Sequence, residues 1–121
     1  MQIKGKWLWI SQRLTAVILF VQALTVLAIW ISASDFNRQD LIAHLQSTGG
    51  FVLHLSALIA LVVHAAIGVW NINTDYLTAA RLGAWAPAIR WSAHLAAGLL
   101  LLAILFFGIQ ILTIASTQTT P

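Results

Sequence analysis

A histidine flanked by small residues is the feature of this sequence most suited to chemistry. Ala60, His64 and Gly68 follow one another at intervals of four residues, which puts them on one face of a helix. The small neighbours leave a shallow surface for a flat porphyrin, and a neutral imidazole is a common axial ligand of haem iron. Small residues at this spacing also allow close helix packing, in which a histidine hydrogen-bonds a neighbouring helix. The residues alone leave haem ligation and ordinary packing both open.

Three further polar residues are expected close together at one edge of the membrane. Asp75 and Tyr76 follow the second long apolar run, and Arg13 opens the first. A neutral tyrosine hydroxyl can donate a hydrogen bond to a carbonyl oxygen, and a carboxylate can orient an arginine. A quinone headgroup requires such groups, so the sequence indicates a quinone pocket at this edge. The alternative is an interfacial tyrosine anchor and a helix-end aspartate, which many membrane proteins have.

Two more histidines lie within apolar runs. His54 precedes His64 by ten residues, or about 15 Å along a helix, so the two cannot bind the same iron. A hydrogen-bonded or interfacial role is expected for His54, with a second haem as the alternative. His94 has Gly98 one turn deeper and lies near the start of the third run. It is expected either to line the same pocket as His64 or to pack against a neighbouring helix.

Three apolar runs must position these residues. The chain has 121 residues, of which 60% are hydrophobic and 7% charged, and its mean hydropathy is +0.91. A run of about 18 or more apolar residues can span a bilayer. The sequence therefore predicts an all-α membrane protein with three transmembrane helices at approximately 14–33, 50–71 and 91–115. Because little chain lies outside these runs, a single transmembrane anchor domain is expected over 1–121.

The distribution of charge predicts the orientation of the helices. Lysine and arginine precede the first run and recur between the second and third, which indicates a cytoplasmic N-terminus and a cytoplasmic second connection. These residues are Lys4, Lys6, Arg13, Arg81 and Arg90. In the first connection, Asp35 and Asn37 are expected to act as turn or cap residues.

The composition also excludes some classes of function. The chain has no cysteine, so it cannot ligate an iron–sulfur cluster through thiolates or form a disulfide. The net charge is +3, but the six Lys and Arg residues are scattered near the ends of the apolar runs rather than gathered with aromatic residues on one face. Nucleic-acid binding is therefore not expected, and the lipid bilayer is the expected surrounding of the apolar runs.

Three short segments together resemble the D subunit of succinate dehydrogenase, the hydrophobic cytochrome b556 anchor. They are SQRLTAV at 11–17, HAAIGVW at 64–70 and TDYL at 74–77. In that family an Arg-x-Thr-Ala element opens the first helix, and a His-x-x-x-Gly element is followed by Asp-Tyr at the end of the second. The order and spacing here are similar to that pattern, and the three-span layout agrees with it.

The resemblance implies a role for each site residue. His64 would be one axial ligand of a b-type haem, with the other ligand supplied by a histidine of the companion C subunit. Tyr76 would hydrogen-bond ubiquinone, Asp75 would support that pocket, and Arg13 would lie near the haem propionates or the quinone. His54 and His94 have no counterpart in the pattern.

The resemblance also implies partners and a reaction. A flavoprotein subunit would oxidise succinate, an iron–sulfur subunit would pass the electrons to quinone, and a cytochrome b C subunit with three helices would pack with this chain around the haem. The complex would act in the tricarboxylic acid cycle and the respiratory chain, in a bacterial inner membrane. This chain would hold no succinate-oxidising residue. The alternatives are a fumarate reductase anchor of the same superfamily and a structural membrane subunit without a cofactor.

Overall fold

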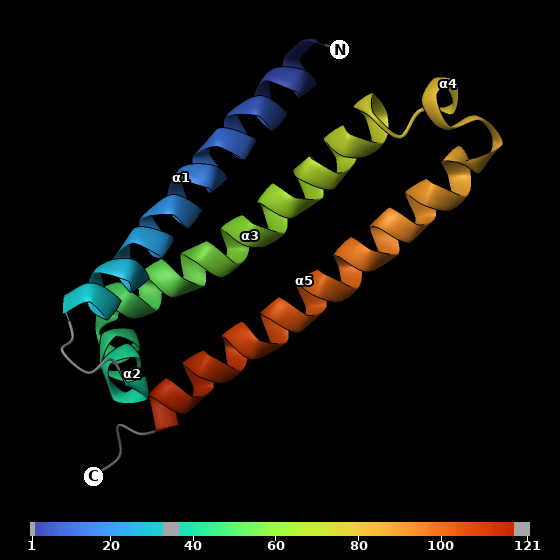
Figure 1. Cartoon of the computed structure of the whole chain (residues 1–121). Coiled ribbons are helices and arrows are strands. Elements are labelled where there is room, and N and C mark those ends of the chain that lie inside the picture. Colours follow the sequence, from blue (N-terminus) through green and yellow to red (C-terminus); the bar gives the residue numbers. More distant parts are fainter. Residues whose placement is uncertain (1, 33–36, 118–121) are drawn as a thin grey trace.

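Three long helices account for most of the fold. The computed structural model describes residues 2–32 and 37–117, and its regular elements there are all helical. The long helices are α1 (Gln2–Ser32), α3 (Thr48–Asp75) and α5 (Ala86–Thr117) (Figure 1). Among the described residues there are three helical segments long and apolar enough to cross a bilayer. The predicted all-α fold with three spans is thereby confirmed.

The long helices extend beyond the apolar runs that predict them. Helix α1 begins at Gln2, twelve residues before the expected span, and α3 ends at Asp75 rather than near 71. A 28-residue helix is about 42 Å long, whereas the hydrocarbon core is about 30 Å thick. The polar end turns therefore continue the helix into the headgroup zone, and hydropathy alone does not detect them. The single anchor domain, the cytoplasmic N-terminus and the packing against a second anchor subunit stay predictions.

A short helix, α2 (Arg38–Gln46), occupies the first connection. Its N-terminus carries a capping box in which Asn37 accepts hydrogen bonds from the backbone of Gln39 and Asp40, while the Asp40 carboxylate accepts one from the Asn37 backbone. The predicted cap role of Asn37 is thus confirmed, whereas Asp35 lies outside the described residues. Hydropathy did not predict α2 because its nine residues are mostly polar.

The second connection contains a four-residue helix, α4 (Ala79–Leu82), and a 3-10 turn, η1 (Gly83–Trp85). Gly83 has φ = +56°, a value that other residues rarely adopt, and it redirects the chain into α5. This connection lies at the same end of the molecule as the start of α1 (Figure 1).

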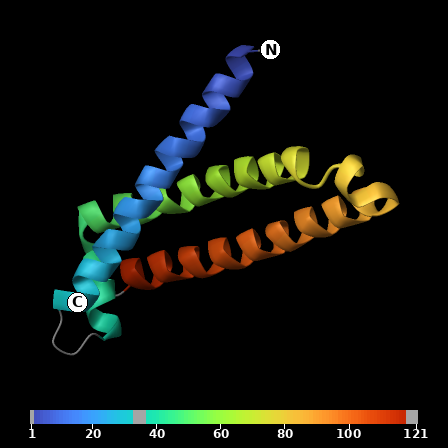
Figure 2. The same ribbon diagram turned by 45° about the horizontal axis from the view of Figure 1, so that its top comes forward.

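Helices α1 and α3 diverge toward one end of the molecule, whereas α3 and α5 stay in contact near both ends. Helix α1 packs on α3, α3 packs on α5, and α2 touches all three; among the described residues, α1 makes no contact with α5. In the tilted view, α1 crosses α3 near α2 and separates from it toward the N-terminus (Figure 2). Helices α1 and α3 therefore form a fork that opens at the end carrying the second connection.

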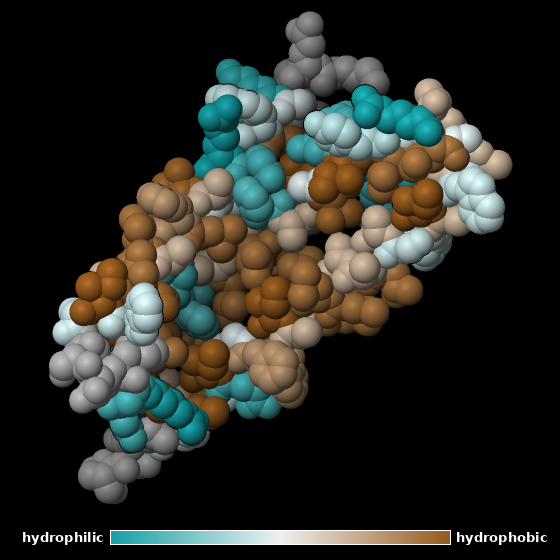
Figure 3. All heavy atoms as spheres, in the orientation of Figure 1, coloured by the Kyte–Doolittle hydropathy of each residue, from teal (hydrophilic) through white to brown (hydrophobic). Residues whose placement is uncertain are grey.

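The internal core is small and lies near the closed end. It consists of Leu45 from α2, Leu58 from α3, and Leu112 and Ala115 from α5. Helices α3 and α5 approach closely at Gly108, where an added Cβ would lie 2.5 Å from Leu58 Cδ2. Apolar side chains instead cover most of the outer surface in the face shown in Figure 3. Such a surface suits lipid and partner helices rather than water.

Candidate functional site

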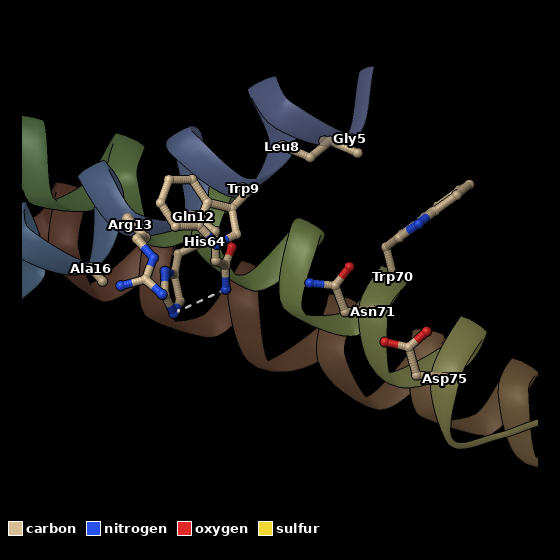
Figure 4. A pocket seen from close by; sticks show the side chains of 10 residues that line it. All are labelled: Gly5, Leu8, Trp9, Gln12, Arg13, Ala16, His64, Trp70, Asn71 and Asp75. Atoms are coloured by element: carbon tan, nitrogen blue, oxygen red, sulfur yellow. Dashed lines mark hydrogen bonds between the residues drawn. The ribbon is translucent and has the colours of Figure 1, made fainter. Parts of the chain in front are cut away.

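A cavity of about 620 Å³ lies where α1 and α3 diverge. Its volume falls within the range of sites that hold cofactors and small molecules. Both helices contribute side chains, which Figure 4 shows on the two sides of the opening. The lining residues are Gly5, Leu8, Trp9, Gln12, Arg13 and Ala16 from α1, and His64, Trp70, Asn71 and Asp75 from α3.

The lining residues of α3 follow the helical repeat. His64, Asn71 and Asp75 are separated by seven and four residues, so they project from the same face. From His64 to Asp75 the cavity follows eleven residues of helix, or about 16 Å. The cavity therefore runs from the middle of the bundle to the end of α3, where polar headgroups would lie.

His64 is half-buried and is held by α1. Its Nδ1 lies 3.1 Å from the Thr15 hydroxyl oxygen, and its Nε2 lies 3.4 Å from the Gln12 amide nitrogen. An added Cβ at Gly68 would have Gln12 Nε2 as its nearest neighbour, at 3.7 Å, and Ala60 is buried. The small residues around His64 thus allow helix packing, and the shallow surface expected beside the imidazole is partly covered by α1.

Arg13 and Asp75 both line the cavity, but they are not paired with each other. The Arg13 guanidinium lies 4.5 Å from the centroid of the Trp9 ring, a cation–π contact one turn away on the same helix. Asp75 is exposed and accepts a hydrogen bond from the Thr74 hydroxyl at 3.3 Å. Within the described part of the chain, Arg13 has no carboxylate partner, so its charge is available to a ligand.

Tyr76 lies beside the cavity rather than in it. It caps the C-terminus of α3, is 59% exposed, and has the Arg81 guanidinium 5.6 Å from the centroid of its ring. A step of one residue turns a helix by about 100°, so Tyr76 projects away from the face that carries Asp75. The structure brings Arg13, His64 and Asp75 to one cavity and leaves the tyrosine hydroxyl on the adjacent surface.

His94 belongs to a different interface, that between α3 and α5. Its Nδ1 donates to the Arg90 carbonyl at 2.8 Å, and its Nε2 lies 3.0 Å from the Asn73 amide nitrogen. Asn73 is only 8% exposed. His94 lines grooves beside Arg90 and does not line the cavity of His64. Of the two expectations for His94, the geometry therefore favours packing between helices.

His54 pairs with α1 near the closed end of the fork. Its Nδ1 lies 3.3 Å from the Gln22 amide nitrogen, and it does not line the cavity of His64. Among the described residues, no group of three or more His, Cys, Asp or Glu side chains could hold a metal ion on its own. The resemblance implies only one imidazole ligand from this chain, so that finding does not bear on His64.

Several residues of the site were not predicted. Gln12 and Asn71 line the cavity, and Asn73 and Gln22 pair with histidines elsewhere. A signal was present in the sequence, because amide side chains are costly within apolar runs unless they find partners on neighbouring helices. Their pairings depend on helix register, which hydropathy does not specify.

Comparison with known families gives a match to a family of membrane subunits. The sequence profile described as succinate dehydrogenase/fumarate reductase transmembrane subunit matches residues 2–86, which is more than half of the chain and includes all the residues that line the cavity. No curated protein and no solved structure matches the chain.

Proposed function

The chain belongs to the succinate dehydrogenase/fumarate reductase transmembrane subunit family, and we propose that it is the D-type membrane anchor of a succinate dehydrogenase, respiratory complex II. As a member of this family it is a multi-pass membrane subunit of an oxidoreductase complex and associates with other subunits of that complex. The assignment to succinate dehydrogenase rests on the resemblance of the segments 11–17, 64–70 and 74–77 to the D subunit.

The observation that carries the proposal is the cavity that His64 shares with Arg13 on α1 and with Asp75 at the end of α3. His64 lies in its interior, and Arg13 and Asp75 line it as well. A bundle held together only by packing has no need of an imidazole, an unpaired guanidinium and a carboxylate around one cavity of about 620 Å³.

The residues of this chain fit one side of a b-type haem. His64 would supply one axial ligand, and a histidine of the C subunit would supply the other. Arg13, which has no carboxylate partner among the described residues, would attract the anionic propionates. When bound, such a haem would accept and donate single electrons.

Tyr76 and Asp75 would bind ubiquinone, and contact with the quinone is the alternative to contact with the haem propionates for Arg13. The tyrosine hydroxyl is exposed at the end of α3, where it can donate a hydrogen bond to a quinone carbonyl that approaches from the bilayer. Asp75 and Arg13 line the neighbouring cavity and would shape the polar side of the pocket. Full reduction of a quinone takes two electrons and two protons, so a site at the aqueous edge is suitable.

The proposed orientation puts this end of the molecule in the cytoplasm of a bacterium. Lys6, Arg13, Arg81 and Arg90 lie in the N-terminal half of α1 or in and just after the second connection, and they favour the cytoplasmic side of the inner membrane. The iron–sulfur subunit, which receives electrons from the flavoprotein subunit, would dock on this side. The cytochrome b C subunit would cover apolar surface that this chain leaves exposed.

A spectrum of the complex tests the proposal. The complex is purified through a tag on this chain, and a reduced-minus-oxidised absorption spectrum is recorded with succinate as the reductant. We expect a b-type haem signal together with flavoprotein and iron–sulfur subunits. Rates of succinate oxidation and fumarate reduction, measured on the same sample, distinguish the two enzymes of the family. A haem-free preparation without these subunits would contradict the proposal and indicate a structural membrane subunit without a cofactor.

A further inference from the structure

Thr15 makes the shorter of the two polar contacts between the His64 ring and α1. It is only 7% exposed, and its hydroxyl oxygen lies 3.1 Å from His64 Nδ1. The same oxygen lies 2.8 Å from the Ser11 carbonyl oxygen and 3.1 Å from that of Gln12. One hydroxyl therefore meets two backbone acceptors and one ring nitrogen.

The single proton of the Thr15 hydroxyl decides which tautomer His64 adopts. A carbonyl oxygen can only accept, so the hydroxyl donates its proton to the nearest one, that of Ser11. A lone pair of the hydroxyl oxygen then faces His64 Nδ1, and it forms a hydrogen bond only if Nδ1 carries the ring proton. In a neutral imidazole with the proton on Nδ1, Nε2 is left with a free lone pair.

The contact at Nε2 is the weaker of the two. The Gln12 amide nitrogen lies 3.4 Å away, beyond the usual range of 2.7–3.2 Å for a nitrogen donor. Within the described part of the chain, the other amide atom of Gln12, Oε1, is buried without a hydrogen-bond partner. The contact at Nε2 is therefore the easier of the two to replace by a ligand, whereas Thr15 is fixed by its bond to the Ser11 carbonyl.

We propose that Thr15 is the positioning residue of His64. The Thr15 hydroxyl holds the ring proton of His64 on Nδ1, so that Nε2 is the nitrogen that binds iron. The inference rests on the proposed function, because it assigns a role in haem binding. Thr15 does not touch the haem in this proposal and acts only through the imidazole. A hydrogen bond accepted from Nδ1 orients the ring and makes Nε2 a stronger electron donor.

The chain offers a matched control at Thr25. Its hydroxyl donates to the Val21 carbonyl at 2.8 Å, the same bond to the residue four positions earlier that Thr15 makes. Thr25 lies on the same helix and is half-buried, and its hydroxyl makes no hydrogen bond to a histidine of the described residues. Replacement of either threonine by valine removes the same bond within α1, and only Thr15→Val also removes the acceptor for His64.

The experiment compares Thr15→Val, Thr15→Ser and Thr25→Val in the complex purified through this chain, with haem expressed per flavin. The readouts are the midpoint potential of the haem and the rate at which haem transfers to excess apomyoglobin.

We expect Thr15→Val to shift the potential to more positive values, because weaker donation by Nε2 stabilises ferric iron less. Haem transfer should become about ten-fold faster or more. Thr15→Ser and Thr25→Val should match the wild type. Thr15→Cys, a poor acceptor of similar size, replaces Thr15→Val if the valine variant does not assemble.

The outcomes separate this inference from the function on which it rests. A wild-type complex without haem overturns the proposed function and this inference with it. A wild-type complex that contains haem, combined with a Thr15→Val complex that has the potential and transfer rate of Thr25→Val, overturns the inference alone. The inference is also overturned if Thr15→Ser behaves like Thr15→Val, because the hydroxyl would then not be the group that matters.

Discussion

His64 and His94 lie at two helix interfaces of the same bundle, yet their hydrogen bonds differ in a way that separates a candidate ligand from a packing residue. Both nitrogens of His94 have close partners, at 2.8 and 3.0 Å, one on α5 and one on α3. His64 has one close partner and one long contact of 3.4 Å, and it lines a cavity with Arg13 and Asp75. The two histidines therefore differ in whether a ring nitrogen remains available to a ligand, and this difference, rather than the position of the residue within an apolar run, identifies His64 as the candidate.

The largest expected effect comes from removal of each imidazole in turn. His64→Ala should reduce haem per flavin at least about ten-fold, because it removes the only proposed ligand on this chain. His94→Ala should retain the haem spectrum and lower the thermal stability of the complex. Absorption spectra and thermal denaturation of the two purified variants measure both effects. Equal haem loss in the two variants would remove the distinction between the interfaces.

The next effect concerns Tyr76, which lies at the end of α3 beside the cavity. Tyr76→Phe should lower the rate of quinone reduction by succinate about ten-fold, because one hydrogen bond to the quinone is lost. The rate with an artificial soluble electron acceptor should stay near that of the wild type, since that reaction does not need the quinone site. A parallel fall in both rates would indicate faulty assembly and not a quinone contact.

Two glycines of the bundle test how tightly each interface is packed. At Gly108, between α3 and α5, an added Cβ would lie 2.5 Å from Leu58, whereas at Gly68, between α3 and α1, the nearest atom would be 3.7 Å away. Gly108→Ala should therefore destabilise the chain by about 1–3 kcal/mol, and Gly68→Ala should be tolerated. Thermal denaturation measures the difference, and Leu58→Ala should partly restore stability to Gly108→Ala. A larger loss in Gly68→Ala would contradict this order.

The smallest effect is expected at Asn73, the partner of His94 on α3. Asn73→Ala should cost about 1 kcal/mol of stability, the typical size of a hydrogen bond between transmembrane helices, and leave the haem spectrum unchanged. The matched change at the other interface, Gln12→Ala, should leave stability nearly unchanged because its contact to His64 is long. A change of the haem spectrum in Asn73→Ala would link His94 to the cofactor and contradict the comparison.

The three spans could be predicted from the sequence because long apolar runs have few alternatives to a transmembrane helix. The helix ends could not, as the polar first turns of α1 from Gln2 onward show. Helix α2 was also missed, although its cap Asn37 was recognised. It forms because a capping box and the burial of Ile42 and Leu45 against α3 and α5 stabilise a segment with little hydropathy signal.

The candidate site was predicted in part. Arg13, His64 and Asp75 line one cavity because His64 and Asp75 lie on the same face of α3, eleven residues apart, and α1 carries Arg13 along that face; the helical repeat can be read from sequence. Tyr76 follows Asp75 directly, so the sequence suggests that both face the same pocket, whereas the helical turn separates them. The pairing of His94 with Asn73 and of His64 with Thr15 depends on how the helices are rotated about their axes, and side-chain packing decides that rotation.

Because α2 touches the long helices at one end, a small change of helix angle at that end corresponds to a large displacement at the other end. Helix α2 touches the three long helices at one end, and Gln46 donates to the Ala115 carbonyl there at 3.1 Å, while the cavity lies at the opposite end. Helix α1 has 31 residues, so its far end lies about 45 Å from the joined end. A tilt of only about 5° at α2 displaces the Gly5 end of α1 by about 4 Å, which is enough to change the width of the cavity mouth. The width of the cavity mouth therefore depends strongly on the angle at which α1 crosses α3 near α2.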